Sequence, residues 1–328
     1  MLIACSGNDE LSKSFWSQHI IFAKDFIETA EGLVFAVVDH TIEHGKVLCF
    51  LRYIKSGSGW KKVDTELANA FLKRHHPDYL HHSPVLDAHL HAVALGRILN
   101  HHKPRHRLQQ IMQADRLDAV ERDLYQLCGL LQQRGLDLAH AGITGSILIG
   151  VQQQSSDIDL VCYGRAAFHQ CRTIVRDLIG LGQLQDLDNC DWQASYQRRS
   201  CELSYADYVW HERRKSNKAV INGRKFDLNF IDDTTPTDVV SYQKCGAITL
   251  RCRIVDDSHA FDYPAEFKTD HAQFGTVVSF TATYTGQAVK GETVEVSGIV
   301  EQTPEGVQRI VVGSSREAHG EYIKVIRA

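Results

Sequence analysis

Hydrophobic and polar residues alternate in short runs in the first third of the chain, between longer stretches in which apolar residues recur at helical spacing. Period-two alternation predicts strands over residues 32–38 and 46–53, followed by a turn at Gly57-Ser58-Gly59. Helical spacing predicts helices over residues 12–30, 64–76, 85–100 and 107–135, the last as one or two helices that end near Gly135. Residues 1–135 are therefore expected to form an α+β region with helices.

The middle of the chain, residues 136–255, combines apolar runs with an amphipathic segment. The run from Ile158 to Val161 has the composition of a buried strand, and residues 225–231 alternate like a half-buried strand. Residues 166–181 have the spacing of an amphipathic helix. This order of elements predicts a mixed sheet that helices cover on one side.

From about Tyr263 the composition changes to Val, Thr and Gly in period-two runs separated by glycines. The runs that predict strands cover residues 276–284, 293–300, 308–312 and 322–326. Short strands at this spacing predict a small β-barrel over residues 256–328, which resembles an oligonucleotide-binding fold. The preceding residues 238–252 are expected to close the middle region instead.

Asp157 and Asp159 are the leading candidates for chemistry, because they lie two residues apart on the predicted strand and project from one face. Like charges this close repel each other unless a cation lies between them. Carboxylate oxygens in an open arrangement suit Mg²⁺ or Mn²⁺, the metals that accompany nucleoside triphosphates such as ATP. The pair therefore predicts a metal site for nucleotide chemistry.

Gly145-Ser146 precedes this strand and supplies a second feature of a nucleotide site. A glycine lets backbone approach a ligand closely, and the serine hydroxyl is expected at the start of a helical turn over residues 146–151. Free N–H groups at the start of such a turn attract phosphate. The segment is therefore expected to bind the phosphates of a nucleotide.

These residues resemble the motif of the DNA polymerase β-like nucleotidyltransferase superfamily. That motif is a hydrophobic residue, Gly-Ser, a spacer, Asp-x-Asp and a third acid on a neighbouring strand. Gly145-Ser146, Asp157, Asp159 and Asp227 match it in order. The resemblance implies that Asp157 and Asp159 hold the catalytic metals, with Asp227 sharing one of them to activate the acceptor hydroxyl. The alternation around Asp227 places it on one face of its predicted strand.

The residues around Gly145 and Asp157 resemble more closely still a family of uncharacterised predicted nucleotidyltransferases found mainly in archaea. This similarity extends over roughly residues 31–255, although only the motifs are specific. Two other interpretations stay open. The first is a chance Asp-x-Asp on an ordinary surface strand. The second is a chain that keeps the fold but only binds nucleotide or acts as an antitoxin-type regulator, since fold does not fix function.

A basic cluster precedes the third acid. It consists of His211, Arg213, Arg214, Lys215, Lys218, Arg224 and Lys225. Cations beside a phosphoryl-transfer site neutralise charge, so Arg214, Lys215 and Arg224 are the candidates for binding the triphosphate or an acceptor backbone. The alternative is a solvated hairpin, because Asn222-Gly223 is a strong turn signal whatever the charges do.

The predicted barrel also has two interpretations. In one, its groove binds single-stranded nucleic acid through cationic and aromatic side chains. The residues expected in that role are Arg309, Arg316, Lys324 and Arg327, with Tyr284 and Tyr322 as stacking platforms. In the other, the barrel is a structural or dimerising module, since five glutamates dilute the charge.

Composition narrows the class of protein. No apolar stretch has the length of a membrane span and the first residues do not read as a signal peptide, so a soluble cytoplasmic protein without membrane contact is expected. The formal net charge of −4 argues against a strongly basic nucleic-acid binder, yet a local basic groove still permits RNA. Nine scattered cysteines without a Cys-x-x-Cys pair fit reduced thiols. The histidines between residues 75 and 106 lack a recognised metal-ligand spacing, and hydrogen-bonded or solvated roles are expected for them.

The sequence thus predicts an enzyme that transfers a nucleoside monophosphate from an NTP to an acceptor hydroxyl and releases pyrophosphate, with Mg²⁺ or Mn²⁺ as cofactor. An RNA 3′ end is the expected acceptor because of the barrel. A protein side chain or a small-molecule hydroxyl is the rival acceptor, and the non-catalytic regulator is the alternative of a different class.

Overall fold

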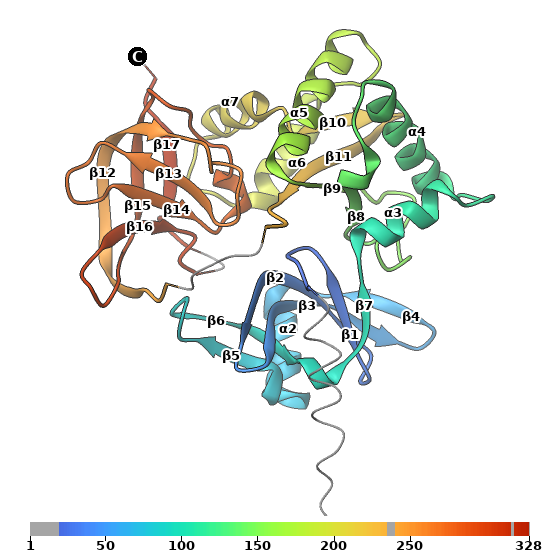
Figure 1. The fold of residues 1–328 in the computed structure, drawn as a ribbon, viewed down its shortest axis with the longest axis horizontal. Coiled ribbons are helices and arrows are strands. Elements are labelled where there is room, and N and C mark those ends of the chain that lie inside the picture. Colours follow the sequence, from blue (N-terminus) through green and yellow to red (C-terminus); the bar gives the residue numbers. More distant parts are fainter. Residues whose placement is uncertain (1–19, 235–239, 316–317, 328) are drawn as a thin grey trace, which may run out of the picture. The chain divides into compact units, whose positions relative to one another are not determined.

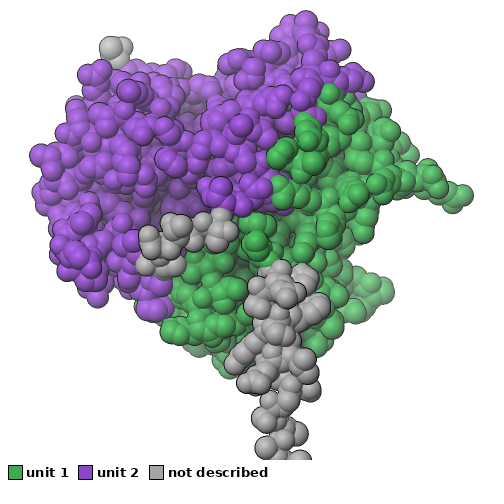
Figure 2. Space-filling view, in the orientation of Figure 1, with its two compact units in different colours: residues 1–83, 89–132, 137–161 green, residues 84–88, 133–136, 162–328 purple. Residues whose placement is uncertain are grey.

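The computed structural model describes residues 20–234, 240–315 and 318–327, and these divide into two compact units (Figure 1, Figure 2). Unit 1 comprises residues 1–83, 89–132 and 137–161. Unit 2 comprises residues 84–88, 133–136 and 162–328. Both units mix helices with strands, and each is described by itself below.

The first part of unit 1 is built on a sheet of seven described strands in the order β5-β6-β3-β2-β1-β7, with β4 paired to β3. The strands are β1 (Phe26–Thr29), β2 (Leu33–Glu43), β3 (Lys46–Ser56), β4 (Gly59–Lys62), β5 (Leu80–Ser83), β6 (Ala88–Ala94) and β7 (Ile98–His102). Helix α2 (Thr65–His75) begins where the Asp64 carboxylate accepts the N–H of Leu67, and it buries Leu72 in one cluster with Phe35 and Leu51. Short 3₁₀ helices, η1 (Pro77–Tyr79) and η2 (Leu95–Arg97), connect these elements.

Two of the helix predictions for this region are wrong. Of the helix expected over residues 12–30, residues 12–19 lie outside the described residues, and Phe26–Thr29 form strand β1 between β2 and β7. The helix expected over residues 85–100 is replaced by β6, η2 and β7, because β6 pairs with β3 through Lys46–Ala94 and Cys49–His91. The strands expected over 32–38 and 46–53, the turn at Gly57 and the helix expected over 64–76 are confirmed.

A second sheet, of four described strands in the order β10-β11-β9-β8, carries the candidate acids. Its strands are β8 (Ala141–Thr144), β9 (Ile158–Tyr163), β10 (Lys218–Ile221) and β11 (Arg224–Ile231). The neighbouring helices are α3 (Pro104–Met112), α4 (Ala119–Gln133), η3 (Leu138–His140), α5 (Arg165–Gly180), α6 (Asn189–Arg199) and α7 (Tyr205–Lys215). The helices expected over 107–135 and 166–181 are thus confirmed as α3, α4 and α5, whereas α6, α7 and β10 were not expected.

The hairpin that joins β10 to β11 follows its sequence signal. Asn222 and Gly223 both adopt positive φ, at 51° and 77°, as a two-residue hairpin turn between right-handedly twisted strands requires. Strand β11 buries Phe226 and Phe230, and Phe230 packs against Phe168 of α5 with ring centroids 5.5 Å apart. The hairpin therefore holds β11 at a fixed register.

The C-terminal part of unit 2 is a closed barrel of five described strands. They are β12 (Gln243–Asp256), β13 (Ala265–Thr269), β14 (Thr276–Ser279), β15 (Thr293–Gln302) and β16 (Gln308–Val312). The order β12-β13-β14-β16-β15 closes through pairing of β12 with β15, β14 and β16 run parallel, and β17 (Tyr322–Val325) pairs with β15. The expected start of the barrel at residue 256 is wrong, because β12 belongs to the barrel and does not close the middle region. The strands expected over 293–300, 308–312 and 322–326 are confirmed.

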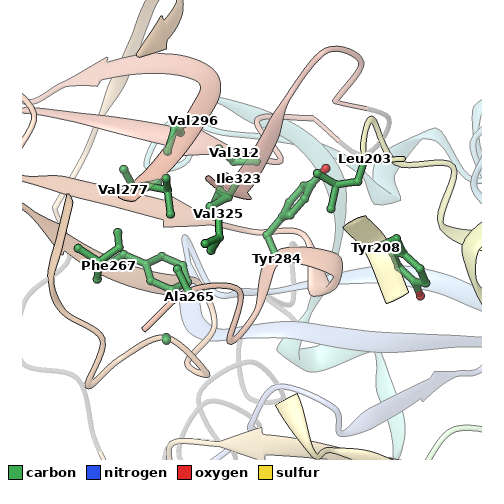
Figure 3. Close-up of a cluster of buried hydrophobic side chains, with 14 of the residues drawn as sticks. Leu203, Tyr208, Ala265, Phe267, Val277, Tyr284, Val296, Val312, Ile323 and Val325 are labelled. Atoms are coloured by element: carbon green, nitrogen blue, oxygen red, sulfur yellow. The ribbon is translucent and has the colours of Figure 1, made fainter. Parts of the chain in front are cut away.

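The barrel shares its hydrophobic core with α6, through Trp192, and with α7, through Tyr208. Figure 3 shows part of this cluster. Phe267, Val277 and Val296 lie inside the barrel in one cluster with Leu203 and Tyr208, and Tyr284 of η4 (Ala282–Tyr284) belongs to the same cluster. The helices and the barrel therefore bury a common apolar surface inside unit 2.

None of the helices in the described part of the chain combines the length and the apolar character that crossing a membrane requires.

Candidate active site

The Asp-x-Asp pair lies at the start of β9. Asp157 directly precedes the strand and Asp159 is its second residue. Ile158 and Leu160 are fully buried, whereas Asp157 and Asp159 are half-buried, so the expected alternation is observed. The apolar residues anchor the strand in the core and leave both carboxylates on the other face.

Residues 145–150 form a hydrogen-bonded turn between β8 and the segment that leads to β9. The N–H of Val151 donates to Ser146 O at 3.0 Å, and the N–H of Gly150 donates to Ile147 O at 3.2 Å. The expected helical turn over 146–151 is therefore present as a turn and not as a helix. It is short because Gly150, at φ 68°, takes a left-handed conformation that ends it.

Gly145 brings this turn against the Asp-x-Asp strand. Its φ is 71°, and a Cβ built on it would overlap Oδ2 of Asp159. Only glycine satisfies both the left-handed backbone and the lack of space at this position. The structure therefore places the Asp159 carboxylate directly against the backbone of the Gly-Ser turn.

Neighbouring elements of unit 1 hold the turn in place. The Thr144 hydroxyl donates to Lys24 O at 2.7 Å, and Arg107 Nε of α3 donates to Ile147 O at 3.0 Å. The same Arg107 pairs with Glu121 of α4 at 2.6 Å. The residue before the turn is thus bonded to the segment that precedes β1, and the turn itself is bonded through Arg107 to α3 and α4.

The first sheet also packs against the turn. Leu148 lies in a cluster with Phe26, Val34 and Tyr53. Burial raises the pKa of the Tyr53 phenol above its usual value, the charge of Arg52 lowers it, and the carboxylate of Asp159 raises it further. Tyr53 is therefore within electrostatic range of Asp159, which no sequence motif indicated.

Asp227, the expected third acid, is the fourth residue of β11. It is half-buried, as is Asn229, while Phe226, Leu228 and Phe230 are buried, which confirms the predicted alternation. In the order of the sheet, β11 is the neighbour of β9. Asp227 is opposite Lys218 of β10 in the antiparallel register.

Within the residues that the structure describes, no group of three or more His, Cys, Asp or Glu side chains is arranged to hold a metal ion. The donor chemistry of Asp157 and Asp159 nevertheless fits a hard cation, because both present half-buried carboxylates from one face.

Comparison with known proteins finds no family model and no solved structure that matches the chain. The chain is 30% identical to the uncharacterized protein MJ1086 of Methanocaldococcus jannaschii over 345 residues, which cover 93% of this chain and 98% of that protein. The chain belongs to the MJ1086 family. The similarity covers nearly the full length of both proteins.

In this MJ1086-family chain, the basic cluster before Asp227 is engaged by acids of unit 2. Lys215 is fully buried, and its Nζ donates to Glu212 at 2.5 Å and to Thr283 O at 2.6 Å. Arg214 pairs with Glu292 at 2.6 Å, and Arg224 is a half-buried residue at the start of β11. We therefore do not retain Arg214 and Lys215 as nucleotide-binding residues, because their charges are compensated by Glu292 and Glu212.

The described barrel residues that were expected to bind nucleic acid also make hydrogen bonds or ion pairs within the protein. Tyr284 as a stacking platform is wrong, since its side chain is buried and its hydroxyl donates to Glu321 O at 3.1 Å. Tyr322 donates to Glu295 at 2.9 Å. Arg309 pairs with Glu301, Lys324 and Arg327 pair with Asp207, and Arg316 lies outside the described residues. These contacts favour the structural interpretation of the barrel.

Several of the histidines between residues 75 and 106 take hydrogen-bonded roles in unit 1. His101 Nε2 lies 2.7 Å from Asp25 Oδ2, and His81 Nε2 lies 3.0 Å from Glu43 Oε2. His91 Nδ1 accepts the N–H of Leu51 at 2.9 Å. Side-chain contacts within unit 1 thus account for His81, His91 and His101.

Replacing Gly145 by alanine tests the contact with Asp159. The alanine must adopt a left-handed φ, and its Cβ must displace the Asp159 carboxylate, so we expect the free energy of unfolding to fall by about 2–3 kcal/mol. Gly150→Ala is the matched control, because Gly150 also has positive φ but no atom lies within 4 Å of its added Cβ. Urea unfolding should show a loss of about 1–2 kcal/mol for Gly150→Ala. Equal losses in the two variants would contradict the close approach of Asp159.

Proposed function

We propose that this chain is a metal-dependent nucleotidyltransferase that moves a nucleoside monophosphate from an NTP to an acceptor hydroxyl. The observation that carries the proposal is the contact between Gly145 of the Gly-Ser turn and the Asp159 carboxylate. It joins a turn suited to phosphate and a carboxylate suited to a divalent cation, as nucleotidyl transfer requires. The similarity of the motif to DNA polymerase β-like nucleotidyltransferases supports the same reaction.

The proposed roles follow from the chemistry of each residue. Asp157 and Asp159 would hold Mg²⁺ or Mn²⁺, which when bound neutralises charge on the triphosphate. The Ser146 hydroxyl and the N–H groups of the turn would bind phosphate oxygens. Asp227 would share one of these metals and accept the proton of the acceptor hydroxyl, whose oxygen forms a bond to the α-phosphorus while the bond to the β-phosphate oxygen breaks and pyrophosphate leaves.

The acceptor class depends on the barrel. Its closed, five-stranded form resembles an oligonucleotide-binding fold, in which the second and third strands present the ligand-binding face. Here the third strand is β14, and Val278, which alternates with the core residue Val277, is buried on the outer face. Among the described residues, the predicted cations Arg309, Lys324 and Arg327 are paired with acids as well. An RNA 3′ end therefore has less support than the transfer reaction itself, and a protein or small-molecule hydroxyl is its rival.

Incubation with α-³²P-labelled NTPs tests the proposal. The purified full-length protein is mixed with each NTP in turn, Mg²⁺ or Mn²⁺ and total RNA, and label is followed into RNA and protein on a gel and into small molecules by thin-layer chromatography. We expect metal-dependent incorporation of one preferred nucleotide, and the labelled species names the acceptor. NTP binding without label in any fraction would contradict transfer and favour a nucleotide-binding regulator.

A further inference from the structure

A buried ionic chain lies next to Asp227 in unit 2. The carboxylate of Glu212, in α7, accepts from Lys215 Nζ at 2.5 Å and from Lys218 Nζ at 2.6 Å. The side chains of Glu212, Lys215 and Lys218 are 2%, 1% and 7% exposed. Charges this deeply buried are stable only when they are paired, so the three groups depend on one another.

This buried ionic chain links the barrel to strand β10. At one end, Lys215 Nζ donates to Thr283 O, in the η4 turn of the barrel, at 2.6 Å. At the other end, Lys218 is the first residue of β10 and is the register partner of Asp227. A continuous series of hydrogen bonds thus runs from the barrel backbone to the residue opposite the third acid.

Lys218 and Asp227 face each other as a non-hydrogen-bonded antiparallel pair. The N–H of Leu228 donates to Asn217 O at 2.7 Å, so Asn217 and Leu228 form the hydrogen-bonded pair and the next pair, Lys218–Asp227, is not hydrogen-bonded. Side chains approach more closely in such pairs, and these two lie on the same face. The Lys218 stem and ammonium therefore limit where the Asp227 carboxylate can lie.

Charge balance supports the same conclusion. The ammonium groups of Lys215 and Lys218 share the carboxylate of Glu212, which leaves the buried group with excess positive charge. Asp227, opposite Lys218 in the register, carries a negative charge next to this excess. The opposite charges therefore attract the Asp227 carboxylate toward Lys218.

We infer that Lys218 is a positioning residue that fixes the Asp227 carboxylate for its proposed role, and that the barrel supports it through Glu212 and Lys215. This inference rests on the proposed function, because it assigns the orientation of the third acid to a specific neighbour. It gives the barrel a role in the transfer reaction that requires no nucleic acid on the barrel surface.

Two effects of Lys218 oppose each other, which makes the inference testable. Its positive charge repels a cation near Asp227, so loss of the charge alone would strengthen metal binding. Its contacts orient the carboxylate, so loss of the contacts would weaken metal binding, as removal of residues that support metal ligands does by about 10–100-fold. The direction of the change distinguishes the two effects.

The test measures Mn²⁺ binding to the full-length protein by electron paramagnetic resonance, with a non-hydrolysable NTP analogue, alongside kcat and KM in the transfer assay. We expect Lys218→Met to weaken binding of one Mn²⁺ by about 10-fold or more and to lower kcat similarly, with KM for the NTP nearly unchanged. Lys218→Arg should restore most of both. Lys268→Met, the same change at an exposed barrel residue, should match the wild type.

Lys218→Gln provides a second variant if the methionine variant does not fold, because its uncharged side chain is one atom shorter and loses the ammonium contact with Glu212 while it stays polar. Mn²⁺ binding by either variant that equals or exceeds that of the wild type would overturn the inference. The proposed function fails separately: a wild-type protein that binds no Mn²⁺ beside the NTP analogue would exclude the metal site itself and the inference with it. An Asp227→Asn variant that loses one Mn²⁺, next to an unaffected Lys218→Met, would retain the function and reject the positioning role.

Discussion

Asp157→Asn and Asp159→Asn are each expected to reduce nucleotidyl transfer by about 10³-fold or more while the chain stays folded. The loss follows because either substitution removes a carboxylate that would hold the divalent cation, whose effect on phosphoryl transfer amounts to several kcal/mol. Asparagine keeps the size of the side chain and relieves the repulsion between neighbouring carboxylates, so the free energy of unfolding should change by no more than about 1 kcal/mol.

The comparison that decides this prediction uses initial rates of label incorporation and urea unfolding for both variants. Asp115→Asn is the matched control, since it makes the same chemical change at an exposed residue after α3. The control should retain wild-type activity. If Asp157→Asn or Asp159→Asn is as active as Asp115→Asn, the two acids do not belong to the proposed site. If the two variants fail to fold and the wild-type protein shows no transfer activity, the acids have a purely structural role.

Acidification from pH 7 to pH 5 is expected to destabilise unit 2 by about 2 kcal/mol through His211. Burial, together with the charges of Lys215 and Arg214, lowers the pKa of His211 from 6.5 to about 3. Both nitrogens of its neutral ring make hydrogen-bonding contacts. Nδ1 contacts Gln287 O at 3.1 Å, and Nε2 accepts the N–H of Val325 at 3.3 Å. The folded state therefore resists protonation.

The direction of the effect follows from the order of the two pKa values. Below pH 6.5 the unfolded chain takes up a proton on His211 that the folded chain does not, so stability falls with pH until the folded pKa near 3 is reached. Glu212 adds a separate loss at lower pH, because its pKa is lowered to about 2 and its contribution disappears between its unfolded value of 4.5 and that point. In the window from pH 7 to pH 5, His169 contributes in the same direction, because burial and the charges of Arg172 and Arg165 lower its pKa, so the His211→Gln variant is needed to separate the two histidines.

Urea unfolding at pH 7 and pH 5, followed by tryptophan fluorescence, measures this effect, because the Trp210 ring lies 4.8 Å from the His211 ring. His211→Gln should flatten the pH dependence over this window, whereas His319→Gln, at an exposed histidine, should leave it as in the wild type. The same slope in the wild type and in His211→Gln would show that other groups cause the acid sensitivity.

Features encoded by neighbouring residues could be predicted from the sequence. The alternation of Ile158 and Leu160 with the two acids, and the turn at Asn222-Gly223, depend only on local backbone geometry. Both are present as expected. Gly145 was expected to allow close approach, although the sequence did not show that the approaching group would be the Asp159 carboxylate.

Features that depend on distant partners could not be predicted. Leu90, Ala92 and Val93 fit a helix or a strand equally well, and pairing with β3 decides for the strand. Strand β12 joins the barrel because it pairs with β15, about fifty residues later. The charges of Arg214 and Lys215 suggested a phosphate site. The i,i+3 spacing of Glu212 and Lys215 is a local signal for their pair, but no local signal identifies Glu292 and Thr283 as the other partners.

The shared core of the barrel and helices α6 and α7 has a consequence for how unit 2 unfolds. Trp192, Leu203 and Tyr208 are buried in the same cluster as Phe267 and Ile310, so separating the barrel from the helices would expose both surfaces to water at once. It would also leave Lys215 without its barrel carbonyl. The barrel is therefore an integral part of one cooperative folding unit with α6 and α7, and it cannot be exchanged or removed like an appended module.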